Sequence, residues 1–493
     1  MQQYIKALDK SLEDSQLNSS EKSTRSAFGQ KSDEVMKQGL AVFKSAFSSM
    51  SSAAERYSEI ESLNLFNQNP ALTPKDIIVM MPDVGTYSPY IEAVFGGAQG
   101  SRFIPYALAD LAIEQEKPVL SSFASLANLP FSGPYCKTPY TTNSIFNISG
   151  MSFGALSKPA VRALSKGAKL AGCWYNTGEG GLSPYHLEGG GDIVFQIGTA
   201  KYGVRDDNGN LSTAKLKEIA AHEQVKMFEI KLSQGAKPGK GGMLPGRKVN
   251  AEIAKIRGIP EGQDSISPNG HLEIKKPSDI LDMLATVRNA TGKPTGFKAV
   301  IGEYTWLETL FAEINHRGVE SAPDFITIDS ADGGTGAAPQ SLLDSVGLPL
   351  RESLPLVINL LEKHGLRERV KVIASGKLIV PSKVAWALAL GADFVVSARG
   401  HMFALGCIQA MQCNKDTCPT GITTHDKRLQ RGLNVADKAQ RVANYNKYVH
   451  YGAGLIAHSC GVSSARELKR EHVRIVQESG LSEPLDKIYE NYK

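Results

Sequence analysis

Short apolar runs, each ending in small or polar residues, recur along the chain from about residue 146. The eight runs are SIFNISGMSFG, GCWYNTGEGG, DIVFQIGTA, MFEIKLSQGA, PTGFKAVIG, DFITIDSADGGTG, VKVIASGK and ADFVVSARG. Continuous apolar runs of this length are typical of strands that are buried on both faces, as in a parallel sheet. The pattern therefore predicts a series of parallel strands.

Stretches with helical periodicity separate most of these runs. The first begins after Ser157, a residue that can cap a helix, and ends at Gly172, with Val161 and Leu164 on its apolar face. Further helices are expected over roughly 213–225, 278–290, 303–317, 350–365 and 380–391. The gap between the second and third runs is too short and glycine-rich for a full helix. The gap between the fourth and fifth runs is long enough to hold an insertion.

Eight parallel strands with intervening helices predict an α/β fold, the (β/α)8 TIM barrel. A doubly wound sheet is the competing architecture, but no GxGxxG turn opens a helix after a first strand. We expect the barrel over residues 146–430, after an N-terminal helical arm (1–65) and a lead-in α/β segment (66–145). A C-terminal helical segment (431–493) should follow it.

The arm carries apolar residues three and four positions apart, which predicts an amphipathic helix. Its apolar face is formed by Met36, Leu40, Phe43, Phe47 and Met50. Two interpretations stay open. The helix packs on the chain's own barrel, or it mediates docking or self-association, and we expect an oligomer.

Composition narrows the function classes further. A net charge of +5 without a dense Lys/Arg run gives no sign of a nucleic-acid surface. The best candidate for a membrane span, residues 384–405, is interrupted by Asp393 and Arg399. Six cysteines in 493 residues do not make a disulfide scaffold, and the first residues do not resemble a secretory signal. We therefore expect a cytoplasmic protein without membrane or nucleic-acid partners.

Polar side chains gather where the predicted strands end. They are Asn176, Glu179, Gln196, Lys231, Gln234, Lys298, Asp329, Asp332, Ser375 and Arg399. TIM-barrel enzymes build their active sites at the carboxyl ends of the strands. Three glycine-containing ends, residues 332–336, 375–377 and 398–400, are candidate anion cradles, with ordinary tight turns as the alternative.

Two further segments carry candidate chemistry. Cys407, Cys413 and Cys418 follow the eighth run with the spacing C-x5-C-x4-C, and a proline follows the last of them. This spacing is unlike a zinc ribbon and suits an iron–sulfur cluster, and three thiols without an evident fourth favour a three-iron cluster. Packing cysteines are the alternative. The segment 231–248 is basic without any acidic residue, which indicates a site for a dianionic substrate or a solvated loop.

Several sequence blocks resemble the flavin-containing synthase domain of glutamate synthase, in order, over about 145–430. They are SGMSFGALS, NTGEGGLSPYH, IKLSQGAKPGKGGMLPG, ISP, DGGTGAAP, ASGK, SARG and GCIQAMQCNKDTCPTG. The resemblance implies a (β/α)8 barrel with FMN and a [3Fe–4S] cluster. Electrons would arrive through the cluster, and reduced FMN would transfer hydride to 2-iminoglutarate formed from 2-oxoglutarate and ammonia or an amine.

The resemblance also assigns residues. The cluster ligands would be Cys407, Cys413 and Cys418. FMN would be held by Ser152, Thr177, Gln196, Lys298, Gly333, Gly334, Gly376 and Arg399, with Lys298 near the reduced ring. The 2-oxoglutarate carboxylates would meet Lys231, Gln234, Lys237 and Ser267. Glu179, Lys231 and Gln234 are the candidate catalytic residues, with Glu179 best placed for proton transfer.

The sequence departs from the large glutamate synthases in two places. It shows no glutaminase domain with a cysteine at position 2, and Leu182 and Ser183 stand where those enzymes have two acids after GEGG. We therefore expect free ammonia or an amine, or a separate glutaminase, as nitrogen source. A ferredoxin or flavoprotein subunit would donate electrons. The alternative function is an FMN and iron–sulfur electron-transfer or scaffold subunit that does not turn over 2-oxoglutarate.

Overall fold

The computed structural model describes residues 101–103, 130–131, 134–333, 338–339, 341–342, 345–477 and 479–489. The chain divides into two compact units, residues 1–79 and 80–493, and every described residue belongs to the second. The predicted N-terminal arm and Gly334 lie outside the described residues. Within the described part, no helix is long and apolar enough to cross a membrane.

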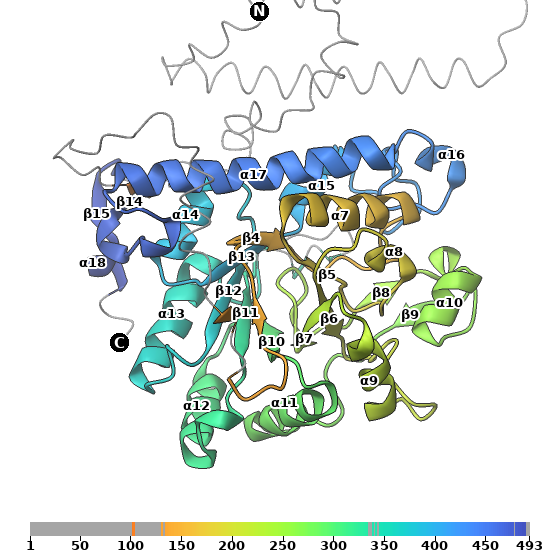
Figure 1. Ribbon diagram of the computed structural model, residues 1–493, viewed down its shortest axis with the longest axis horizontal. Helices are drawn as coiled ribbons and strands as arrows, with labels where there is room; N and C mark the ends of the chain where they lie inside the picture. Colours follow the sequence, from red (N-terminus) through yellow and green to blue (C-terminus); the bar gives the residue numbers. More distant parts are fainter. Residues whose placement is uncertain are drawn as a thin grey trace, which may run out of the picture. The chain divides into compact units, whose positions relative to one another are not determined.

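A closed parallel barrel forms the centre of the described unit (Figure 1). Its strands are β4 (Phe146–Ile148), β5 (Tyr175–Asn176), β6 (Ile193–Ile197), β7 (Val225–Lys231), β10 (Thr295–Ala299), β11 (Phe325–Asp329), β12 (Lys371–Ser375) and β13 (Phe394–Ser397). They are hydrogen-bonded in chain order, and β13 closes the barrel against β4. Seven of the apolar runs contain one of these strands and the fourth overlaps β7, so the predicted (β/α)8 barrel is confirmed.

Helices connect most strands as the periodicity predicts. They are α7 (Lys158–Ala171), α9 (Thr213–Ala221), α11 (Pro277–Thr291), α12 (Thr305–Arg317), α13 (Leu350–Lys363) and α14 (Pro381–Ala389). Ser157 caps α7 by accepting a hydrogen bond from the Ala160 amide, and Gly172 ends it with φ +70°. The connection between β5 and β6 holds only the four-residue α8 (Pro184–Leu187). The long gap after β7 holds β8 (Met243–Leu244), η4 (Gly246–Lys248), α10 (Ala251–Arg257) and β9 (Ser265–Ile266).

The inner face of the barrel changes character along the strands. Side chains alternate between faces, so Met227, Glu229 and Lys231 of β7 share one face. At the amino-terminal end the interior is apolar, and its buried cluster comprises Tyr140, Trp174, Val194, Met227, Phe325, Ile373, Phe394 and Val396. The middle is polar and hydrogen-bonded, and the carboxyl end is charged. The candidate site therefore lies at the charged end, above an apolar floor.

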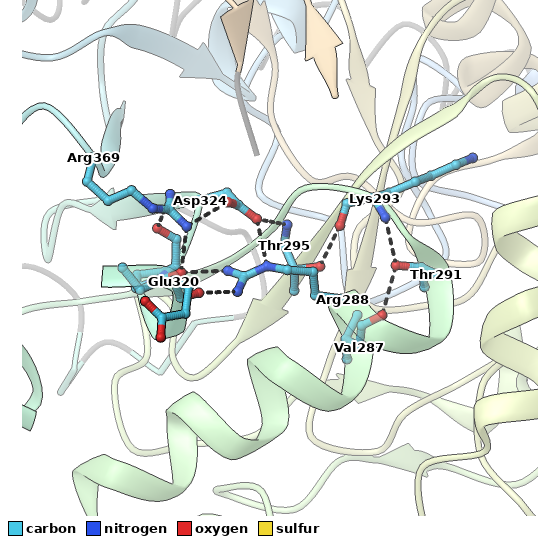
Figure 2. Close-up of polar contacts among 10 residues, drawn as sticks. Val287, Arg288, Thr291, Lys293, Thr295, Glu320, Asp324 and Arg369 are labelled. Carbon is cyan, nitrogen blue, oxygen red and sulfur yellow. Dashed lines mark hydrogen bonds and ion pairs between the residues drawn. The ribbon is translucent and has the colours of Figure 1, made fainter. Parts of the chain in front are cut away.

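A buried ion cluster holds the opposite, amino-terminal end together (Figure 2). Asp324 is fully buried, and its Oδ2 accepts hydrogen bonds from Arg288 Nε at 3.1 Å and from the Thr295 amide at 2.8 Å. Its Oδ1 accepts from Arg369 Nη2 at 3.0 Å. These residues join α11, β10 and the segments before β11 and β12. Their place at the amino ends of the strands indicates a role in stability rather than in chemistry.

The C-terminal part of the chain packs on the barrel. The elements after β13 are α15 (Arg399–Leu405), α16 (Lys427–Gln430), α17 (Val435–Ser459), η6 (Ala465–Glu467), η7 (Arg470–His472) and α18 (Leu485–Tyr489). The long α17 lies along α7, α14 and α15 (Figure 1). A small antiparallel sheet of β1 (Ser101–Phe103), β14 (Val473–Val476) and β15 (Ser482–Pro484) adds to the helices predicted here. The remaining elements are β2 (Pro130–Phe131), paired with β3 (Tyr140–Thr141), and η5 (Val319–Ser321).

Candidate functional site

Three of the predicted site residues meet at the carboxyl end of β7. Lys231 is the last residue of the strand and is buried. Its Nζ donates a hydrogen bond to Gln234 Oε1 at 2.6 Å and lies 3.3 Å from Glu179 Oε1. Glu179 comes from the glycine-rich loop after β5, so two strand ends contribute to the cluster. The structure thus brings together all three candidate catalytic residues.

Two glycines make room for the Glu179 side chain. A Cβ at Gly242 would lie 2.1 Å from Glu179 Oε1, and a Cβ at Gly198 would lie 2.6 Å from Glu179 Cβ. Burial alone would raise the pKa of Glu179. The attraction and hydrogen bond of Lys231 oppose burial, assisted by the charges of Lys237 and Arg257, and the net result is a lowered pKa. Glu179 is therefore a carboxylate at neutral pH.

The remaining residues predicted to bind substrate surround this group. Lys237 is buried, and its pKa is lowered by burial and by repulsion from Lys231. Ser267 follows β9, is buried, and donates its amide to the Gly242 carbonyl at 2.8 Å. The chain around β8 and β9 therefore covers Glu179. His271, which sequence reasoning did not single out, lies within hydrogen-bonding distance of the Lys231 carbonyl, with Nε2 3.0 Å away.

Lys298 forms a second ion pair at the same end of the barrel. It lies on β10 and its Nζ is 3.3 Å from Asp329 Oδ2 of β11. Asp329 Oδ1 accepts from the Ser375 hydroxyl at 2.6 Å, and Oδ2 accepts from the Gly235 amide at 2.9 Å. Because Gly235 directly follows Gln234, Asp329 connects the two ion pairs through one short loop.

A buried glutamate lies in the polar middle layer of the barrel. Glu229 Oε1 accepts hydrogen bonds from Asn176 Nδ2 at 2.8 Å and Gln196 Nε2 at 2.7 Å, and Oε2 accepts from Thr327 Oγ1 at 2.6 Å. Sequence reasoning missed this residue. The available signal was an acid inside an apolar run, because a buried carboxylate needs several donors.

The residues that the resemblance assigns to FMN lie in two groups. Thr177 Oγ1 accepts from the Gln196 amide at 3.1 Å, and a Cβ at Gly178 would lie 2.9 Å from the Ser152 amide, so the ends of β4, β5 and β6 converge. Lys298, Gly333 and Gly376 lie around β10, β11 and β12. The Gly333 amide donates to the Ser330 carbonyl, and a Cβ at Gly376 would lie 2.3 Å from Ser330 Cβ. Gly334 is outside the described residues.

Arg399 begins α15, after β13, and is partly exposed. The glycine beside it has a packing role. A Cβ at Gly400 would lie 1.9 Å from the Tyr445 hydroxyl of α17. Close approach of α17 therefore accounts for Gly400, whereas the anion-cradle interpretation of residues 398–400 stays a prediction.

The three cysteines of the C-x5-C-x4-C segment influence one another electrostatically. The pKa of Cys407 is raised by burial first and then by the nearby Cys413 and Cys418. Burial also acts to raise the pKa of Cys418, but hydrogen bonds from Thr420 and Thr423 outweigh it and lower the pKa to about 7. Within the described residues, no three His, Cys, Asp or Glu side chains are close enough to hold a metal ion.

The basic segment 231–248 divides between two places. Lys231 and Lys237 lie at the barrel mouth, whereas its last residues contact the cysteine segment. Arg247 Nη2 donates to the Asn414 carbonyl at 2.7 Å, and the Lys248 ammonium is buried against residues 155, 413 and 423. The segment therefore does not act as one substrate loop, which the sequence pattern did not reveal.

Comparison with protein families assigns the chain. Residues 113–463, well over half of its length, match the family model described as "Conserved region in glutamate synthase". The chain belongs to the glutamate synthase family. The matched residues include all eight barrel strands and the cysteine segment.

Named relatives agree with the family. The "Glutamate synthase large subunit-like protein YerD" of Bacillus subtilis is 46% identical over 346 residues, which are 70% of this chain and 65% of that protein. The "Archaeal glutamate synthase [NADPH]" of Methanocaldococcus jannaschii is 34% identical over 339 residues, 66% of this chain and 61% of that protein. The chain thus spans less than two thirds of the length of either relative.

The similar solved structures are distant from this chain in sequence. A "(Putative)lactate oxidase" of Pediococcus acidilactici is similar with 15% identity and a TM-score of 0.45, over 79% of this chain and 94% of that chain.

The donor set at the strand ends of this glutamate synthase-family barrel fits a flavin nucleotide. Hydroxyl, amide, ammonium and guanidinium groups come from the ends of β4, β5, β6, β10 and β13. Gly150 lets the Asn176 and Gln196 side chains pack closely against the backbone after β4, because a Cβ there would lie 3.0 Å from Asn176 Oδ1 and 3.2 Å from Gln196 Nε2. The thiols of the cysteine segment likewise suit an iron–sulfur cluster as donors.

Proposed function

We propose that this chain is a glutamate synthase-like oxidoreductase that holds FMN and a [3Fe–4S] cluster. Its reaction would condense 2-oxoglutarate with ammonia or an amine to 2-iminoglutarate, with loss of water. Hydride from reduced FMN and a proton would then give glutamate or an N-substituted relative. The observation that carries the proposal is the cluster of Glu179, Lys231 and Gln234 at the barrel mouth, beside the buried Lys237.

This cluster suits a dicarboxylate substrate. Lys231 and Lys237 supply two ammonium groups in a partly desolvated place, where attraction to carboxylates is stronger than in water. Gln234 holds Lys231 through its side-chain oxygen at 2.6 Å, which leaves its amide nitrogen for a substrate oxygen. An electron-transfer or scaffold subunit would not need such an arrangement, so the cluster favours turnover over that alternative.

Glu179 is the candidate for proton transfer. Condensation of an amine with a 2-oxo acid requires protons to leave nitrogen and reach the departing oxygen. Because its pKa is lowered, Glu179 is ionised and can accept a proton at a carboxylate oxygen. Lys231, whose ammonium lies 3.3 Å from the Glu179 carboxylate, would exchange protons with it. Gly198 and Gly242 keep the carboxylate in place.

FMN would occupy the residues at the strand ends, and the iron–sulfur cluster would occupy the cysteine segment. Ser152, Thr177, Gln196, Lys298, Gly333, Gly334, Gly376 and Arg399 would hold FMN, and Cys407, Cys413 and Cys418 would ligate the cluster. When bound, the cluster supplies single electrons and the flavin supplies hydride. Lys298 places positive charge at the barrel mouth, where it would favour an anionic reduced ring. Separate glutaminase and electron-donor subunits are part of the proposal.

The test is an assay of the purified chain with 2-oxoglutarate, a chemical reductant and either 15N-ammonium or amide-15N-glutamine. We expect 15N-glutamate from ammonium and not from glutamine. Lys231→Met should abolish the product, while an exposed-lysine control, Lys240→Met, should retain most of it. A wild-type protein that contains FMN and iron but forms no glutamate would instead support the electron-transfer alternative.

A further inference from the structure

Lys248 is a buried lysine that holds three separate segments together. Its side chain is about 1% exposed. The ammonium Nζ donates to the carbonyl oxygens of Ala155 at 2.8 Å, Thr423 at 2.9 Å and Cys413 at 3.3 Å. Ala155 lies between β4 and α7, whereas Cys413 and Thr423 lie within and just after the cysteine segment. All three N–H groups of the ammonium are therefore used to fix the cysteine segment to the barrel.

Lys248 forms no close ion pair with a carboxylate in the described part of the chain. Among the described residues, no ion pair within 4.0 Å joins its ammonium to an acid, and the three hydrogen-bond acceptors are neutral carbonyls. Among the acidic groups that act on it electrostatically, the Asp416 carboxyl has the largest effect, and the Cys413 and Cys418 thiols follow. A buried cation is costly unless an anion compensates it. The structure therefore places a buried ammonium group against Cys413 and within electrostatic range of Cys418.

The backbone of the cysteine segment is also unusual. Gln409, Met411 and Asp416 adopt positive φ angles of 55°, 52° and 60°, although none is a glycine. Such conformations persist only where the surroundings impose them. Two contacts hold this segment: the Lys248 bond to the Cys413 carbonyl and the bond from the His425 amide to Asp416 Oδ1 at 2.8 Å.

We infer that Lys248 is a positioning residue for the iron–sulfur cluster, fixing the backbone of Cys413 and supplying the buried positive charge that the thiolate-ligated cluster compensates. The inference rests on the proposed function, because it requires a cluster in the cysteine segment. Two consequences follow. Loss of the tether weakens retention of iron, and loss of the charge makes the cluster harder to reduce, because reduction adds an electron next to it.

The experiment compares Lys248→Met and Lys248→Gln with wild type and with Lys415→Met. Lys415 is an exposed lysine in the same segment, so its charge is screened by solvent. Iron and acid-labile sulfide per chain, the rate of iron loss to a chelator, and the reduction potential of the cluster by EPR-monitored titration are measured. FMN content and circular dichroism report whether the barrel is folded.

We expect Lys248→Met to lose iron roughly tenfold faster than wild type and to show a lower cluster potential. Lys415→Met should match wild type in both. Lys248→Gln keeps a hydrogen-bond donor without the charge, so it should retain more iron than Lys248→Met but show the same lowered potential. It also carries the test if Lys248→Met does not fold.

The outcomes separate this inference from the proposed function. Wild-type protein without iron would overturn both the cluster proposal and the role of Lys248. Wild-type protein with iron, together with folded Lys248 variants of unchanged iron retention and potential, would overturn the role of Lys248 alone. A changed iron content with an unchanged potential would reduce Lys248 to a structural tether and contradict the electrostatic half of the inference.

Discussion

Lys231 and Lys298 are register partners on the adjacent parallel strands β7 and β10, yet their ammonium groups pair with different carboxylates. Lys231 pairs with Glu179 and Lys298 with Asp329, each at 3.3 Å. Neighbouring ammonium groups repel each other, and each of these two has its own carboxylate partner. Glu179 lies in the loop after β5 and Asp329 lies at the end of β11. The barrel mouth therefore contains two separate lysine–carboxylate pairs.

We predict that the stability contributed by Glu179 depends on pH. Its folded-state pKa is lowered from 4.5, so its contribution is present above that value and is lost as pH falls through the folded-state pKa. Glu179→Gln should lower the free energy of unfolding by about 2 kcal/mol at neutral pH. In chemical denaturation at a series of pH values, the difference from wild type should shrink below pH 4.5.

Glu218→Gln on α9 is the control for this prediction, because its carboxylate is exposed. It should leave the stability nearly unchanged at every pH. A difference between Glu179→Gln and wild type that is the same at acid and neutral pH would contradict the assigned ion pair.

We predict opposite shifts of the flavin potential from the two members of the Lys298–Asp329 pair. Lys298→Met should lower the potential and weaken FMN retention, because the proposed FMN site would lose a positive charge near the reduced ring. Asp329→Asn should raise it, because Lys298 loses its counter-ion while the hydrogen bond from Ser375 is kept. Spectroelectrochemical titration measures both.

Lys371→Met is the matched control, since Lys371 is the first residue of β12, at the other end of the barrel, where it pairs with Asp393. Its flavin potential should equal that of wild type. Unaltered potential and FMN stoichiometry in Lys298→Met would assign Lys298 to structure.

We predict that Glu229 is required for the barrel interior. Glu229→Leu leaves buried donors of Asn176, Gln196 and Thr327 without an acceptor and should cost about 3–5 kcal/mol of unfolding free energy. Glu229→Gln keeps one carbonyl oxygen and should cost about 1–2 kcal/mol. Urea denaturation of both variants gives the comparison, and equal stabilities would show that the hydrogen bonds contribute little.

We predict that Cys413→Ser lowers the iron content per chain and locally loosens the cysteine segment, because cluster binding contributes to the order of its loop. Cys173→Ala is the control. Burial raises the pKa of Cys173 to about 12, so it is an inert packing thiol. Iron analysis and hydrogen exchange over residues 407–424 measure the effect. Unchanged iron in Cys413→Ser would remove it from the ligand set.

The barrel could be predicted because its signal is local. Each strand is a continuous apolar run with a polar end, and Ser157 and Gly172 mark the ends of α7 by their own backbone preferences. The same polar ends predicted Lys231, Gln234 and Glu179, which the closed barrel brings together. The small sheet formed by β1 and β14 pairs residues far apart in sequence, and no local pattern reports such pairing.

The roles of Glu229 and Lys248 could not be read from the sequence for a related reason. Glu229 is explained by donors on β5, β6 and β11, and Lys248 by carbonyls at residues 155, 413 and 423. Backbone carbonyl groups have no signature in the sequence. In the sequence, Lys248 therefore cannot be distinguished from the other lysines of segment 231–248. Its ammonium is nevertheless buried at the cysteine segment and not at the barrel mouth.

The two ends of the barrel interior differ in polarity. Along β7 the inner face passes from Met227 through Glu229 to Lys231, a rise of about 13 Å over four residues. Buried apolar side chains fill the other end, which offers ions and polar solutes no partners. In the proposed reaction, substrate, product and protons would therefore enter and leave through the charged end. Any redox partner that docks over that opening would compete with substrate exchange, and electron delivery and product release would have to take turns.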